Sequence, residues 1–398
     1  MVKVKTANRK SLFGGTLEDI IEYNWYISGV GELDVSFGLC RESGLVMQTR
    51  TVTPEEMTSY YEDVATYVSS SRNGNPTQAK VEDLNRLISL VKLSCDSFPS
   101  KVLQFGSSDG YTLSRFQASG STKLLGIEPS ELSRNFARSR YGITTLEGTI
   151  EEYDSIEKFN LIIATHILEH LYDPYKVLNH IRKNLTQDGW LLIEVPLWEK
   201  ESMQPIGVLT FEHLNYFCEE TLTRVIFNSG YDIVHISKNY NINHYPVITI
   251  LAKVKSNDDL NYVSFVSGNY EKNKIMLLSY IKRESEFWRN KEQSIYNQIK
   301  SSMPTYIYGG GVHTSQLLSM TNVIKNINIS NVIDESETKQ GKMVFGIEIK
   351  PPSIILLIKT NSNIIISSRA FELDILKSIK ETRSDLNIIT LYQYGDVK

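Results

Sequence analysis

Compact apolar runs alternate with helical repeats through the middle of the chain. Apolar residues from 78 to 94 recur at helical spacing, which predicts a helix. Strands are predicted after it at 101–105, 123–127, 161–164, 190–195, 231–236 and 247–254, and helices at 111–119, 174–184 and 221–228. Apolar strands alternating with helices are typical of a parallel, doubly wound sheet, so the predicted fold class is α/β.

Two further parts flank this central unit. The N-terminal part shows short strands at 20–27, 35–39 and 44–47 and a polar loop at 69–76. Residues 258–300 repeat as a helix with one apolar face, and strands follow at 305–308, 329–333, 354–358, 364–367 and 386–391. We therefore expect a small mixed N-terminal domain (1–77), a central α/β domain (78–256), a helical connector (257–302) and a second α/β domain (303–398).

Composition narrows the class of protein. The 398 residues are 41% hydrophobic and 22% charged, as in globular proteins of two or three domains. A net charge of -4 provides no electrostatic footprint for nucleic acid. The three cysteines are far apart, so we expect no disulfide framework. No signal peptide is evident, and no apolar run approaches the roughly 20 residues of a bilayer span. These features predict a cytoplasmic protein without a membrane span.

A glycine turn follows the first central strand. The strand runs into Gly106, and Gly110 opens the next helix, whose N-terminus offers unpaired N–H groups. Glu128 ends the second strand, where a carboxylate can accept both ribose hydroxyls of an adenosine. The turn alone also fits a purely structural strand–helix connection.

The turn does not match a dinucleotide site. Ser108 and Tyr111 stand where a dinucleotide fingerprint requires glycine, and Asp109 would repel a pyrophosphate. A nicotinamide dehydrogenase is therefore the least supported class of enzyme. The acidic group suits a cationic adenosine cofactor without phosphates, such as S-adenosylmethionine.

The order of segments resembles class I S-adenosylmethionine-dependent methyltransferases, with a Rossmann-like sheet. The similarity lies in 106–110 (GSSDG), 126–130 (GIEPS), 147–150 (EGTI), 159–170 (FNLIIATHILEH) and 185–196 (LTQDGWLLIEVP). It implies cofactor contacts for the methionine end at Gly106, Ser107, Ser108, Asp109 and Gly110, for the ribose at Glu128 with Pro129 beside it, for the adenine at Thr149 and Ile150, and for the sulfonium at Thr165 and His166.

The HILEH stretch at 166–170 also invites a metal interpretation, because residues four apart share one face of a helix. Zinc peptidases have His-Glu-x-x-His, whereas here Glu169 directly precedes the second histidine, His170. No third ligand is obvious in the sequence. We therefore expect Glu169 and His170 to be packing or capping residues, without a metal.

A possible base lies beyond the fifth central strand, in TFEHLNYF at 210–217. Loops at this edge of a doubly wound sheet surround the ligand, and His213 has a carboxylate, Glu212, next to it. This pattern predicts that His213 accepts a proton while the methyl group is attacked. The competing interpretation is a buried histidine that fixes the loop.

The three-part chain resembles bacterial sugar C-methyltransferases, which act on nucleotide-linked keto-deoxysugars. The similarity includes YVS at 67–69, EHLNYF at 212–217, YIYGGGVH at 306–313 and VIDESETKQG at 332–341. It implies base-assisted enolisation beside a ketone, followed by carbon methylation, with His213 as the base or its relay. The catalytic residues would be His213 and Glu212, and the substrate contacts Tyr67, Asn215, Tyr216 and His244.

The chain departs from that family at several positions. The family's zinc domain has two cysteine pairs, of which only Cys40 remains, so no zinc is expected there. A family tyrosine ahead of the Glu-His pair is missing from Thr210-Phe211, and HYPVIT at 244–249 lacks the family's glycines and arginine. Sugar O-methylation, with His213 deprotonating a hydroxyl, and a catalytically silent binding protein are therefore alternatives. The C-terminal turn at 309–313, with Asp334, either frames the substrate or binds its own nucleotide.

Overall fold

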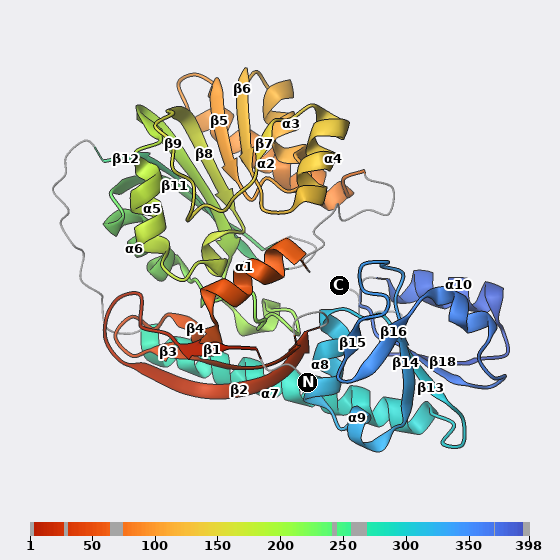
Figure 1. Cartoon of the computed structure of the whole chain (residues 1–398). Coiled ribbons are helices and arrows are strands. Elements are labelled where there is room, and N and C mark those ends of the chain that lie inside the picture. Colours follow the sequence, from red (N-terminus) through yellow and green to blue (C-terminus); the bar gives the residue numbers. More distant parts are fainter. Residues whose placement is uncertain are drawn as a thin grey trace.

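The computed structural model describes residues 4–27, 31–63, 75–240, 245–255, 269–369 and 371–392. These residues form three separate β-sheets, one in each third of the molecule (Figure 1). No helix among the described residues is both long and apolar enough to cross a lipid bilayer.

The central sheet has seven strands in the order β11-β12-β9-β8-β5-β6-β7. Its members are β5 (Lys101–Phe105), β6 (Lys123–Ile127), β7 (Thr145–Leu146), β8 (Phe159–Thr165), β9 (Leu185–Pro196), β11 (Tyr231–Asn239) and β12 (Val247–Val254). Neighbouring strands from β9 to β7 are parallel, whereas β12 is antiparallel to both β9 and β11. The doubly wound α/β sheet predicted from the sequence is confirmed.

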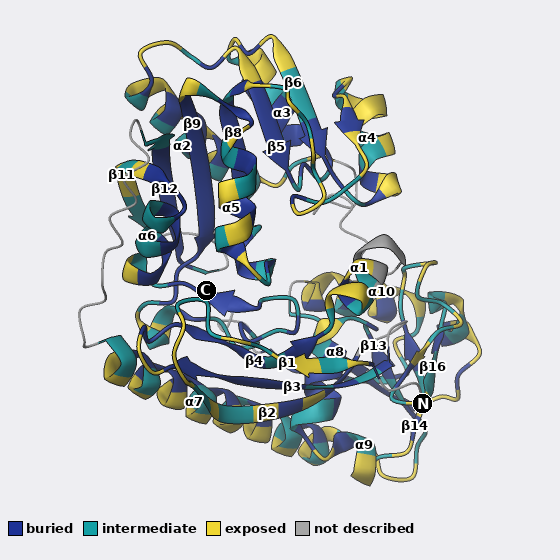
Figure 2. Ribbon diagram, turned by 60° about the vertical axis from the view of Figure 1, so that its left-hand side comes forward, coloured by how far each residue is buried: buried dark blue, intermediate teal, exposed yellow. Residues whose placement is uncertain are grey.

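Helices cover both faces of the central sheet. They are α2 (Gln78–Ser94), α3 (Tyr111–Ala118), α4 (Glu131–Tyr141), α5 (Pro174–Arg182) and α6 (Glu219–Asn228). Residues of α5 and α6 share one apolar cluster with the strands, and residues of α2, α3 and α4 share another. The inner strands β5, β8, β9 and β12 are buried over most of their length (Figure 2). The edge strand β11 is mostly exposed or half-buried. Because helices cover both faces, a ligand of this domain is expected to bind at the carboxyl ends of the strands.

The N-terminal sheet is antiparallel, with the order β1-β4-β3-β2. Its strands are β1 (Thr6–Asn8), β2 (Leu17–Ile27), β3 (Gly31–Cys40) and β4 (Val46–Val52), and α1 (Pro54–Asp63) follows them. A fifth strand, β10 (Asn215–Tyr216), joins this sheet by pairing with β4, although it lies between β9 and α6 in the chain. The central and N-terminal parts are therefore joined through a shared sheet.

The long helix α7 (Asn269–Gln298) packs against the N-terminal sheet. Its Met276, Leu277 and Tyr280 are buried in the same cluster as Val35 and Phe37 of β3. The helix predicted as a connector thus also contributes to a core. The limits of the four domains stay predictions.

The C-terminal sheet has the order β15-β16-β14-β13-β17-β18. Its strands are β13 (Thr305–Tyr308), β14 (Ile329–Ile333), β15 (Met343–Val344), β16 (Ile347–Lys350), β17 (Asn363–Ile366) and β18 (Asn387–Thr390), and its helices are α8 (Val312–Met320), α9 (Val323–Asn326) and α10 (Glu372–Thr382). All pairs are parallel except β15 with β16.

The prediction of a strand at 354–358 was wrong. Residues Pro352–Leu356 form the short 3-10 helix η3 instead. Pro352 has no N–H for a strand ladder, and Leu356 and Leu357 are exposed rather than buried in a sheet. An apolar run of this length does not by itself distinguish a strand from a helical turn.

Candidate active site

The turn between β5 and α3 has a backbone that requires glycine. Gly106 and Gly110 have φ angles of 61° and 77°. A Cβ on Gly106 would lie 2.4 Å from Cδ1 of Ile167, and one on Gly110 would lie 2.7 Å from Cβ of Ala137. Ser108, between them, also has a positive φ of 48°. Both glycines therefore serve close packing as well as the turn.

Glu128 closes this turn from the end of β6. Its carboxylate accepts hydrogen bonds from the N–H of Ser108 at 2.9 Å and from the N–H of Ser130 at 3.0 Å. Burial raises the pKa of Glu128 above its ordinary value, although both N–H groups and Arg134 oppose the rise. A carboxylate has about four lone-pair sites, so two remain for ribose hydroxyls.

Asp109 is buried and already has a cationic partner. The ammonium of Lys80, in α2, lies 2.9 Å from its carboxylate, which also accepts the N–H of Tyr111 at 3.1 Å. From the sequence, Asp109 was expected to suit a cationic cofactor. In the structure its charge is already balanced by Lys80, and its carboxylate accepts the N–H of the first residue of α3.

The other predicted cofactor residues lie along the same edge of the sheet. Ser107 is buried, and its N–H donates to Ile127 at 3.2 Å. Pro129 lies between Glu128 and Ser130, the N-cap of α4; Thr149 is partly buried and Ile150 is buried. Thr165 ends β8, and His166 follows it with a φ of 56°. Their contacts with a cofactor stay predictions.

A single glutamine of β4 fixes the loop that contains His213. The side-chain amide of Gln48 donates to the carbonyl oxygens of Thr210 at 2.9 Å, Phe211 at 3.1 Å and His213 at 2.8 Å. Gln48 is fully buried. Sequence reasoning missed it, because nothing local distinguishes a glutamine that bonds a loop far away in the chain.

The predicted substrate residues divide into two groups. Glu212 accepts a hydrogen bond from the hydroxyl of Tyr60 in α1 at 2.9 Å, at the boundary between the two sheets. Asn215 and Tyr216 instead bond within the protein: the Asn215 amide donates to Leu171 at 2.8 Å, and the Tyr216 hydroxyl accepts from the N–H of Thr210 at 3.0 Å. This geometry favours a structural role for both. Tyr67 and His244 lie outside the described residues.

The structure brings His213 beside Glu169 and His170. One ligand atom from each of these three side chains lies within 4.8 Å of the other two. The His170 and His213 rings are edge to face, with centroids 4.8 Å apart. No third ligand is obvious in the sequence for the 166–170 stretch, and the structure brings His213 beside it. The third group comes from a loop more than 40 residues further along the chain.

Burial and charge act in opposite directions in this cluster. Burial, with a smaller contribution from the nearby His170, lowers the pKa of His213 to about 3. Burial opposes ionisation of Glu169 as well, but His166 and His170 together lower the pKa of its carboxyl group. His213 is therefore a neutral imidazole at neutral pH, and Glu169 a carboxylate.

Residues 78–236 match the model of a family described as a methyltransferase domain. This segment is a class I methyltransferase domain. Its sheet order and the glycine turn at the carboxyl end of β5 agree with the match. S-adenosylmethionine is the cofactor of domains of this class, so the predicted methyltransferase domain and its cofactor are confirmed.

Segments similar to part of this chain occur in tRNA U34 carboxymethyltransferases. The tRNA U34 carboxymethyltransferase of Alteromonas mediterranea is 27% identical over 104 residues, which cover 23% of this chain and 31% of the relative. That of Dichelobacter nodosus is 34% identical over 104 residues, 24% of this chain and 32% of the relative. The chain spans about a third of the length of the curated relatives it matches.

A solved S-adenosylmethionine dependent methyltransferase from Mesorhizobium loti is also similar to this chain. It aligns with 44% of this chain and 97% of its own length, at 13% identity and a TM-score of 0.36.

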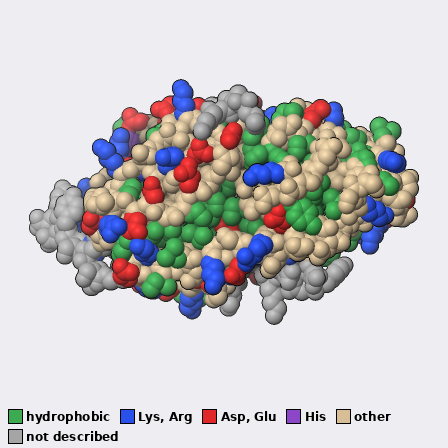
Figure 3. Space-filling view, turned by 90° about the horizontal axis from the view of Figure 1, so that it is seen from below, with side chains coloured by type: hydrophobic (Ala, Val, Ile, Leu, Met, Phe, Trp, Pro, Cys, Tyr) green, Lys and Arg blue, Asp and Glu red, His purple; other side chains and the backbone are tan. Residues whose placement is uncertain are grey.

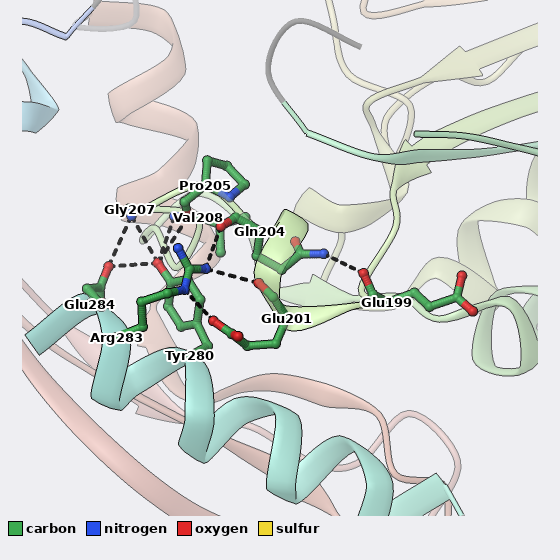
Figure 4. Close-up of polar contacts among 9 residues, drawn as sticks. All are labelled: Glu199, Glu201, Gln204, Pro205, Gly207, Val208, Tyr280, Arg283 and Glu284. Atoms are coloured by element: carbon green, nitrogen blue, oxygen red, sulfur yellow. Dashed lines mark hydrogen bonds and ion pairs between the residues drawn. The ribbon is translucent and has the colours of Figure 1, made fainter. Parts of the chain in front are cut away.

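The loop that leaves the methyltransferase sheet after β9 is anchored on α7 (Figure 4). The hydroxyl of Tyr280 accepts the N–H of Gly207 at 2.9 Å and the N–H of Val208 at 3.1 Å, and it donates to Glu284 at 2.7 Å. The guanidinium of Arg283 donates to the carbonyl oxygens of Glu201 and Gln204. The helix beneath the N-terminal sheet thus also fixes a loop at the carboxyl edge of the methyltransferase domain.

Proposed function

We propose that the chain transfers the methyl group of S-adenosylmethionine to a nucleotide-linked or otherwise activated sugar. The observation that carries this proposal is the position of the cluster of Glu169, His170 and His213. It lies directly after β8, next to the strand that leads into the glycine turn, and loop residues bonded to the N-terminal sheet border it. An acceptor between the methyltransferase domain and that sheet would have ionisable groups beside it.

Residues of this cluster can take up the proton that carbon methylation of a keto-sugar releases. His213 accepts the proton from the carbon beside a sugar ketone as the enolate forms, and the carboxylate of Glu169 beside it favours the imidazolium that results. The enolate carbon then attacks the methyl group in line, the carbon–sulfur bond breaks, and its electron pair stays on sulfur as S-adenosylhomocysteine. Glu212 orients the acceptor from the neighbouring position, where its carboxylate already accepts a hydrogen bond from Tyr60.

The first test is cofactor binding, measured by calorimetry with S-adenosylmethionine, S-adenosylhomocysteine and NAD. Purified protein is then incubated with keto and hydroxy nucleotide-sugars, and the new methyl group is located by NMR. A carbon-bound methyl group supports the mechanism above, and a methoxy signal supports sugar O-methylation with His213 deprotonating a hydroxyl. Cofactor binding without turnover on any acceptor would favour a silent binding protein.

The role of the base has its own test. His213→Ala should abolish turnover while S-adenosylhomocysteine still binds, because His213 is not among the residues expected to bind the cofactor. The control is His235→Ala, an exposed histidine on β11. Full turnover by His213→Ala would eliminate His213 as the base.

The named relatives favour a second acceptor class, transfer RNA. The similarity to them covers only about a quarter of this chain. The net charge of -4 gives no general attraction to a polyanion. On the face seen in Figure 3, acidic and basic side chains are interspersed without a continuous basic surface among the described residues. A sugar acceptor is therefore the better supported proposal.

A further inference from the structure

Two buried polar groups of the cluster lack hydrogen-bond partners. Both carboxylate oxygens of Glu169 and the Nδ1 atom of His213 are buried, and none of the three has a hydrogen-bond partner among the described residues. Glu169 is 1% exposed. Its Oε1 lies at ion-pair distance from Nδ1 of His166, at 3.5 Å, and from Nε2 of His170, at 3.9 Å, and His166 lowers the pKa of this carboxyl group. Buried groups of this kind cost free energy unless a further species satisfies them.

The hydrogen bond of His170 fixes which of its nitrogen atoms carries a lone pair. Nδ1 lies 2.9 Å from the carbonyl oxygen of Glu212. A carbonyl oxygen only accepts, so Nδ1 carries the proton and Nε2 the lone pair. Histidines that bind metals usually donate their other ring N–H to a carbonyl or carboxylate, which orients the ring. Nε2 lies 3.9 Å from Oε1 of Glu169.

We propose that Glu169, His170 and His213 bind a divalent transition-metal ion, with zinc as the simplest candidate. Two imidazoles and one carboxylate are a ligand set of catalytic zinc sites and of non-haem iron sites, and they leave positions open for substrate. The inference deepens the proposed function, on which its catalytic meaning rests, but ion binding itself does not depend on the acceptor.

The geometry needs only small side-chain movements. Tetrahedral bonds of about 2.0–2.1 Å to zinc place ligand atoms about 3.4 Å apart. The three atoms now lie within 4.8 Å of one another, so rotations about side-chain bonds bring them into range. Glu169 and His170 are adjacent in the short 3-10 helix η1 (Leu168–His170), and Gln48 fixes the backbone at His213. The movement therefore requires no change of fold.

An ion at this site alters the role of His213. A ring that coordinates the ion through Nδ1 cannot accept a proton there. The ion would lower the pKa of a water that it held, so the resulting hydroxide, in place of His213, would take the proton from the carbon beside the ketone and become water. The ion would also polarise a ketone oxygen, which is the requirement for enolisation.

The test uses the full chain, stripped with a chelator and titrated with cobalt(II) chloride, whose visible absorption reports coordination by nitrogen and oxygen. Zinc binding is then measured by calorimetry. We expect one ion per chain. Glu169→Gln, His170→Gln and His213→Gln should each weaken binding about tenfold or more. His235→Gln, which changes an exposed histidine on β11, should leave the affinity unchanged.

Binding of S-adenosylhomocysteine verifies that each variant is folded; Glu169→Asp replaces Glu169→Gln if that variant is not, and His170→Ala and His213→Ala replace the corresponding glutamine variants. Absence of stoichiometric binding, or wild-type affinity in the three variants, would overturn the metal site. An ion that binds and is lost in these variants supports the metal site even if no sugar is methylated. A metal-free chain that methylates sugars at the full rate would overturn a catalytic ion and leave the base mechanism in place.

Discussion

Individual side chains at the boundary between the two sheets determine the shape of the candidate site. Gln48 has no chemistry of its own, yet its amide bonds three carbonyl oxygens of the loop that contains His213. Glu128 similarly connects the glycine turn to the start of α4, because its carboxylate accepts the backbone N–H groups of Ser108 and Ser130. Both residues act on the backbone, so changing them tests the geometry without removing a reactive group.

Gln48→Leu should uncouple the loop from the N-terminal sheet. Three carbonyl groups lose their donor, and we expect a loss of about 1–3 kcal/mol in the free energy of unfolding, with methyl transfer reduced more than binding of S-adenosylhomocysteine. Thermal denaturation, turnover and calorimetry measure the three effects. Gln293→Leu, on an exposed position of α7, is the matched control. Unchanged stability and turnover in Gln48→Leu would contradict the assigned role.

Glu128→Gln should weaken cofactor binding by about tenfold or more, since the amide replaces an acceptor by a donor that faces backbone N–H groups. The control is Glu131→Gln, at the exposed first residue of α4. If the variant bound S-adenosylhomocysteine as tightly as the wild type, the ribose role of Glu128 would be excluded.

The same carboxylate predicts how binding depends on pH. The pKa of Glu128 is raised above its ordinary value of 4.5, so the group becomes neutral at a higher pH than an exposed glutamate. As pH falls through that raised pKa, the protonated group loses acceptor capacity, and the affinity for S-adenosylhomocysteine should fall. Calorimetry across this range should show the decrease in the wild type and a flatter profile in Glu128→Gln.

Regular elements with a clear pattern could be predicted closely from the sequence. The expected strands at 101–105, 123–127, 247–254, 305–308 and 329–333 agree with β5, β6, β12, β13 and β14. Each is a compact apolar run bounded by turn residues, and β5 and β12 are buried over most of their length, as their apolar composition indicates. β10 and the cluster of Glu169, His170 and His213 could not be predicted, because they depend on contacts between distant segments.

Helix α7 also shows the difference between a local pattern, which the sequence reveals, and contacts with distant segments, which it does not. Its periodicity predicted a helix, but not that the helix stabilises both the N-terminal sheet and the loop at 197–208. Tyr280→Phe removes the acceptor of the buried N–H of Val208 and one of the two acceptors of the partly buried N–H of Gly207, which keeps Glu284. We expect a loss of about 1–3 kcal/mol in the free energy of unfolding, measured by chemical denaturation.

The control for this change is Tyr296→Phe, further along the same helix, whose hydroxyl bonds the partly exposed Glu292. Tyr296→Phe should lower the free energy of unfolding by less than Tyr280→Phe, because water can replace the lost hydroxyl at that position. Equal losses in the two variants would mean that the Gly207–Val208 contact does not stabilise the fold.

At the scale of the whole molecule, charge provides a test of the acceptor class. The chain has 46 acidic and 42 basic residues. Labelled tRNA should therefore show no saturable binding at physiological salt when measured by fluorescence anisotropy, since phosphate contacts need local positive charge. A known tRNA-modifying enzyme is the positive control for the labelled RNA. Tight binding that weakens steeply with added salt would instead favour the tRNA acceptor.

The pairing of β10 with β4 also has a consequence for how the chain is made. The N-terminal sheet is synthesised first, but its edge partner at 215–216 and its covering helix at 269–298 leave the ribosome much later. Until then, the apolar face of β3 has no cover. Newly made chains should accordingly depend on chaperones until α7 emerges, and a truncation before residue 269 should aggregate rather than fold as a smaller enzyme.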